Sequence, residues 1–74
     1  MGRLIRLDGT GHTTLAEWTA DDEGAQRAAA EAFRRELEAG MLASVTSPEN
    51  GAEVVRELPL DAELVVLRRP IAGG

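Results

Sequence analysis

Residues 63–68 read Glu-Leu-Val-Val-Leu-Arg, a nearly continuous apolar run in a chain of 74 residues. Such a run is typical of a β-strand that is covered on both faces, because a half-exposed strand alternates apolar and polar side chains. Pro59, upstream of the run, has no backbone N–H to donate and should end the strand before it. We therefore expect residues 63–68 to form a central strand of a sheet, parallel to the first strand of the chain.

Four further strands are predicted from β-branched and apolar residues bounded by turn-forming glycine, proline and asparagine. They cover residues 3–8, 12–18, 41–45 and 52–58. In the first strand, Ile5 and Leu7 share one face. The second strand is ambiguous, because Ala16 and Trp18 alternate together whereas Leu15 points the other way. The pattern leaves its inward face open.

A helix over residues 22–39 is the most strongly patterned element. Its apolar residues Ala25, Ala29, Phe33 and Leu37 recur at every fourth position and form one stripe. Acidic residues at its start suit the positive end of the helix dipole, and a glycine follows its end. The element order β-β-α-β-β-β, with this stripe across one face of a mixed sheet, predicts an α+β protein of the β-grasp type. Its single domain should cover residues 1–69.

Composition excludes several functional classes. The net charge of −5 argues against nucleic acid and anionic membranes as partners, because both are bound through excess Lys and Arg. No apolar run approaches the ~20 residues that span a bilayer, and the N-terminus lacks a signal-peptide pattern, so we expect a cytoplasmic protein. The chain has no cysteine and one histidine, His12, so no metal site is expected. No catalytic constellation is visible, and we do not expect an enzyme.

The last residues form a separate unit, 70–74, which we expect to be a flexible C-terminal tail. Pro70 interrupts strand pairing, and Ile71, Ala72, Gly73 and Gly74 follow it. Two residues without side chains give the slimmest backbone for bringing an α-carboxylate through a narrow channel to the α-phosphate of ATP. An acyl-adenylate formed there can be attacked by a sulfur donor or by a cysteine thiolate.

The segment 58–74 resembles the C-terminal part of the ubiquitin-like sulfur carriers, the type of the molybdopterin synthase small subunit and the thiamine-pathway carrier. In that family an apolar strand is typically followed by Pro-Pro-Val-Ala-Gly-Gly. Pro70 matches the second proline, Ile71 stands for valine, and Ala72-Gly73-Gly74 match outright. Arg69 replaces the first proline, and the stretch Leu67-Arg68-Arg69 is similar to the tail of ubiquitin, which is rich in Leu and Arg before its Gly-Gly.

The resemblance implies a ubiquitin-like carrier or modifier that is adenylated at Gly74 by a ubiquitin-activating-like enzyme. That enzyme uses ATP, and the carrier itself holds no permanent cofactor. The carboxylate would become a thiocarboxylate for a sulfur acceptor, or an isopeptide bond to a target protein. Gly73 and Ala72 would line the channel of the activating enzyme. Arg68, Arg69, Pro70 and Ile71 would supply recognition contacts.

A second hypothesis belongs to another class. A β-grasp domain can also serve, without activation, as an interaction or structural module within a larger protein assembly, such as a phage particle. It would then use a sheet edge or surface rather than the carboxylate of Gly74. The sequence leaves the choice between sulfur carrier, conjugated modifier and structural module open.

Overall fold

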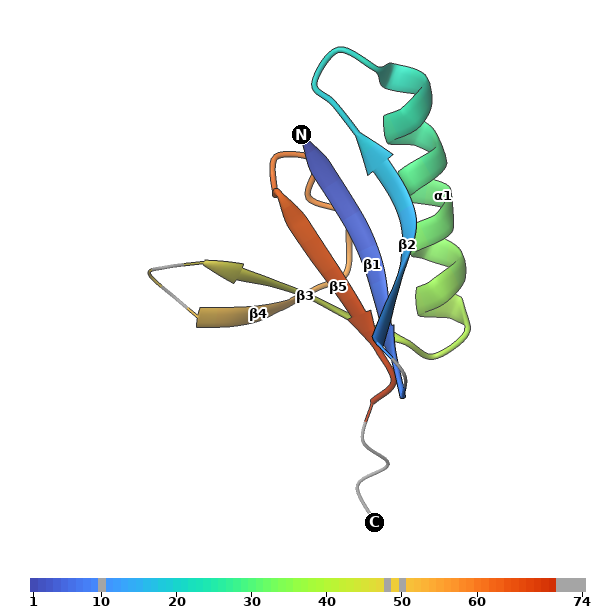
Figure 1. Cartoon of the computed structure of the whole chain (residues 1–74), viewed down its shortest axis with the longest axis vertical. Helices are drawn as coiled ribbons and strands as arrows, with labels where there is room; N and C mark the ends of the chain where they lie inside the picture. Colours follow the sequence, from blue (N-terminus) through green and yellow to red (C-terminus); the bar gives the residue numbers. More distant parts are fainter. Residues whose placement is uncertain (10, 48, 50, 71–74) are drawn as a thin grey trace.

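The computed structural model describes residues 1–9, 11–47, 49 and 51–70. One helix packs on one face of a five-stranded sheet, which confirms the predicted α+β class and element order (Figure 1). The elements are β1 (Gly2–Asp8), β2 (Gly11–Trp18), α1 (Glu23–Glu38), β3 (Leu42–Ser47), β4 (Gly51–Val55) and β5 (Leu64–Arg68). β4 is shorter than the strand predicted over residues 52–58, because the chain bends away from the sheet from Arg56 onward and returns toward the core at half-buried Leu58.

The strand order is β2-β1-β5-β3-β4, so the last strand lies in the middle of the sheet. β5 pairs in parallel with β1, Leu4 lying opposite Val65, and antiparallel with β3, Ala43 lying opposite Leu67. The predicted central position and parallel pairing with the first strand are confirmed, but the expectation that this strand is covered on both faces is wrong, because Leu64 is 44% exposed on the face away from α1. The arrangement is a mixed sheet covered by one helix and is compatible with a β-grasp fold.

The two faces of the sheet have different environments. Leu4, Ala43, Val65 and Leu67 face α1 and are fully buried in the core cluster, which Phe33 joins from the helix. Ile5 is also buried, with 8% of its surface exposed, but it lies outside this cluster because the next residue of a strand points to the opposite face. The face shared by Ile5 and Leu7 is therefore the open one.

A β-bulge settles the orientation of β2. The register with β1 shifts between the pairs Leu4–Ala16 and Ile5–Thr14, so Leu15 is an extra residue on β2. Because of the bulge, Leu15 and Ala16 both pack against the core instead of pointing to opposite faces. Trp18, further along the same strand, is almost completely buried.

Local hydrogen bonds define both ends of α1. The Asp22 carboxylate accepts the backbone N–H of Ala25 at 2.9 Å, as expected of an N-cap. At the other end, Gly40 has a φ of +97°, its N–H donates to the carbonyl of Leu37, and the N–H of Met41 donates to the carbonyl of Glu36. These two bonds form a Schellman motif, which requires the left-handed conformation that glycine adopts without strain.

The buried stripe of α1 makes Phe33 the largest single contribution of the helix to the core. Replacing Phe33 by Ala should lower the free energy of unfolding by about 3–5 kcal/mol, because a large cavity would open in the core cluster. Urea unfolding followed by circular dichroism measures this, with Arg34→Ala on the exposed side as the control. A loss below ~0.5 kcal/mol would show that Phe33 does not lie in the core.

Gly2 is held against the indole of Trp18. A Cβ built on Gly2 would overlap the indole ring, whose Nε1–H donates to the carbonyl of Leu60 at 3.0 Å and so resists displacement. Gly2→Ala should therefore destabilise the fold by roughly 1–3 kcal/mol, as overpacked cores do. Gly9→Ala is the matched control, because no atom lies within 4 Å of a Cβ at that position. Equal melting temperatures for the two variants would show that Trp18 does not restrict the size of the side chain at position 2.

Candidate functional site

The candidate site lies where β5 ends. Arg68 is the last residue of β5, and Arg69 and Pro70 follow it outside any strand. Figure 1 shows the chain leaving the sheet after β5. The other predicted site residues, Ile71, Ala72, Gly73 and Gly74, lie outside the described residues. The structure therefore places three members of the predicted set.

Arg68 lies on the open face of the sheet. It pairs with Leu42 of β3, and because its neighbour Leu67 faces the core, Arg68 points the other way. On the β1 side of Arg68, the parallel ladder ends with the pair Arg6–Leu67. Leu7 and Arg68 are the next residues of the two strands, so they lie next to each other. Leu7 and Leu42 are exposed to 44% and 37%, so the Arg68 guanidinium is flanked by two accessible leucines.

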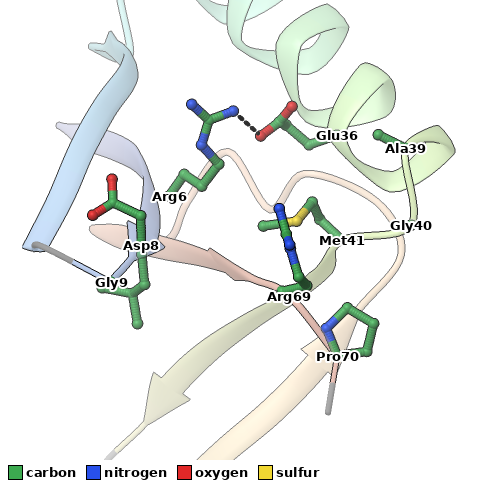
Figure 2. Close-up of a pocket in the computed structure, with 10 residues that line it drawn as sticks. Arg6, Asp8, Gly9, Glu36, Ala39, Gly40, Met41, Arg69 and Pro70 are labelled. Atoms are coloured by element: carbon green, nitrogen blue, oxygen red, sulfur yellow. Dashed lines mark hydrogen bonds and ion pairs between the residues drawn. The ribbon is translucent and has the colours of Figure 1, made fainter. Parts of the chain in front are cut away.

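Arg69 points to the other side of the sheet, toward α1. Figure 2 shows its side chain extending alongside Met41, on the side where Arg6 meets Glu36. These four side chains line a concavity of about 1000 Å³. Its lining residues come from the ends of β1, α1 and β5: Arg6, Leu7, Asp8, Gly9, Glu36, Ala39, Gly40, Met41, Arg69 and Pro70.

An ion pair joins the sheet to the end of α1 in this concavity. Arg6 Nη1 lies 3.0 Å from Glu36 Oε1, and the Glu36 side chain is only 18% exposed. This pair bridges β1 and α1, residues thirty positions apart in the chain. By contrast, Arg68 and Arg69 have no ion-pair partner among the described residues.

Metal binding finds no support among the described residues, which contain no group of three or more His, Cys, Asp or Glu that could hold a metal ion. His12 is exposed on β2. Within the described part of the chain, no helix is long and apolar enough to cross a membrane.

Sequence reasoning missed two features of this region. The Arg6–Glu36 pair gave no local signal, because its partners meet only in the folded chain. The exposed apolar residues of the open face were also missed, namely Leu7, Leu42, Val54 and Leu64. The sequence did carry one signal for this apolar surface. Ile5 and Leu7 lie on the face opposite Leu4, so β1 has apolar residues on both of its faces.

Comparison with known proteins finds no matching family model, no matching curated protein and no matching solved structure. The properties of the site therefore follow from its own residues and geometry.

The partly buried ion pair should contribute more than an exposed one. A double-mutant cycle on Arg6→Met and Glu36→Gln should give a coupling energy of about 1 kcal/mol, the upper end for pairs near a surface. The matched control is the pair Arg34–Glu38 on α1, which is 3.6 Å apart with side chains 74% and 72% exposed. Its coupling should be about 0.3 kcal/mol. Equal coupling energies would show that the Arg6–Glu36 pair does not anchor α1 to β1.

Proposed function

We propose that this chain is a ubiquitin-like β-grasp carrier or modifier that acts through the carboxylate of Gly74. The observation that supports the proposal is the position of β5. This strand is paired with β1 from Leu64 to Leu67 and with β3 from Val66 to Arg68. The chain then leaves the sheet through Arg69 and Pro70, and the Gly-Gly pair follows. The proposal concerns the form of the protein whose last residue is Gly74.

The length and composition of this segment suit an activation reaction. Residues 71–74 span at most about 13 Å when extended, at ~3.3 Å per residue, enough to reach into a channel while the domain stays outside. The Gly74 carboxylate oxygen would attack the α-phosphorus of ATP and displace pyrophosphate. A sulfur donor or a cysteine thiolate would then attack the carbonyl carbon and release AMP. Gly73 and Gly74 bring no Cβ to hinder either step.

Recognition of the strand end would involve both faces of the sheet. Arg68 lies on the open face, and Arg69 lies on the side of α1. An activating enzyme that binds residues 71–74 would therefore contact the chain just before them on both faces of the sheet. Arginine suits this role, because its planar guanidinium binds carboxylates through two hydrogen bonds. The partners of such a protein are an adenylating enzyme and a sulfur acceptor or conjugation target.

The second candidate function is a non-activated interaction module. The exposed apolar residues of the open face favour it, since accessible apolar surface of this kind often marks a protein contact. This function needs the open face and does not need Gly74, so the two candidates differ in the residue on which they depend.

Removing Gly74 tests the proposal. Deletion of Gly74, or Gly73→Val, should abolish ATP–pyrophosphate exchange catalysed by the activating enzyme of the source organism, because the reacting carboxylate is displaced or a β-branched side chain enters the channel. Arg68→Ala and Arg69→Ala should each raise the KM of the exchange roughly fivefold, as expected for exposed contacts of ~1 kcal/mol.

The control is Arg27→Ala on α1, which should exchange like the unmodified chain. Melting temperatures should stay unchanged in all these variants, since none alters the core. Full biological function in a strain that carries only the Gly74 deletion would exclude the carrier and leave the interaction module.

A further inference from the structure

A cleft opens in the sheet between β3 and β5. The two strands pair over only three residue pairs, from Leu42–Arg68 to Ser44–Val66. β3 continues to Ser47 in register with β4, and the β3–β4 hairpin turns away from β5 (Figure 1). The first residues of β5 and the last residues of β3 therefore border a gap instead of a ladder.

The gap is a lined cleft of about 490 Å³, inside the range of roughly 300–1,000 Å³ that is usual for ligand pockets. Val45 and Ala62 form part of it and also pack against the core, which makes them a rigid apolar floor. Thr46, Leu64 and Val66 contribute from the open face. Leu64, the first residue of the central strand, is 44% exposed.

The rim of the cleft is acidic. Asp61 and Glu63 line it, both are exposed, and no described residue forms an ion pair with either. No basic residue is among the described residues of the lining. Arg3 lies nearby, but its guanidinium pairs with Glu17 at 3.3 Å. An apolar floor with free carboxylates at its edge is complementary to a large aliphatic side chain with a cation beside it.

We propose that this cleft is a docking site for a segment of another protein that inserts a leucine-like side chain and carries an arginine or lysine next to it. Insertion would cover Leu64 and Val66 and would pair the cation with Asp61 or Glu63. A second copy of this chain would bring Arg68 beside Leu42, but its net charge of −5 opposes the approach, so the occupant that we propose is a separate basic segment. An acidic segment would be repelled for the same reason.

The cleft is separate from the site of the proposed function. It lies at the start of β5, beside Leu64, whereas the chain leaves the sheet after Arg68 at the other end of the strand. At ~3.3 Å per residue the two ends are about 13 Å apart. A partner in the cleft would leave residues 70–74 accessible, so the two sites can be tested independently.

The test uses the whole chain labelled with ¹⁵N and three tripeptides as probes. Acetyl-Arg-Leu-Arg-amide should shift the amide resonances of Thr46, Leu64 and Val66 in a saturable manner. Acetyl-Glu-Leu-Glu-amide and acetyl-Arg-Ala-Arg-amide should bind roughly tenfold more weakly, because each lacks one of the two complementary features.

Two variants of the cleft complete the design. Thr46→Phe should fill the cleft from an exposed strand position and abolish binding of the Leu peptide. Asp61→Asn with Glu63→Gln should remove the preference for the arginine peptide over the glutamate peptide. The matched control is Asp21→Asn with Glu31→Gln, which removes the same two charges from exposed positions before and on α1. These two double variants change only exposed side chains and should fold.

The proposal is overturned if the shifts fall outside the cleft, if all three peptides bind alike, or if the control variant loses the arginine preference as the cleft variant does. Absence of any shift at millimolar peptide has the same consequence. None of these outcomes bears on the proposed activation at Gly74, which is measured by pyrophosphate exchange.

Discussion

Burial of β5 between β1 and β3, beneath α1, is the interaction on which the rest of the structure depends. Val65 and Leu67 are fully buried and join Leu4 and Phe33 in one core cluster. A domain this small hides only ~60% of the surface that its unfolded chain exposes, so few residues carry its stability. No described polar or charged residue is buried. The core therefore depends on apolar packing and on the backbone ladders of the sheet.

The same strand also presents its other residues to the open face. Because side chains alternate, the burial of Val65 and Leu67 leaves Leu64, Val66 and Arg68 on the opposite side of the sheet. A central strand is thus both the core of the domain and the middle of an accessible surface. The candidate contacts accordingly lie at the two ends of β5.

The β3–β4 hairpin leaves the rest of the sheet where the pairing of β3 with β5 ends, at Ser44. Beyond Ser44, β3 is held by β4 alone, and the corner that includes Pro59 and Ala62 occupies the space below. The N–H of Ala62 donates to the carbonyl of Pro59 at 3.0 Å, which makes this corner a closed turn. This corner and the diverging strand border the cleft.

The sequence by itself determined the elements, because the periodic helix stripe around Phe33 and the continuous apolar run of β5 are local patterns that can be buried in one simple way. It did not determine the inward face of β2, since the bulge at Leu15 exists only through pairing with β1. Arg68 and Arg69 point in opposite directions because Arg68 is held in the pleated ladder with β3, which ends there, and Arg69 is the next residue. The Arg6–Glu36 pair and the acidic cleft join residues far apart in the chain. Only the tertiary structure decided these, because their energies depend on distances that no local pattern encodes.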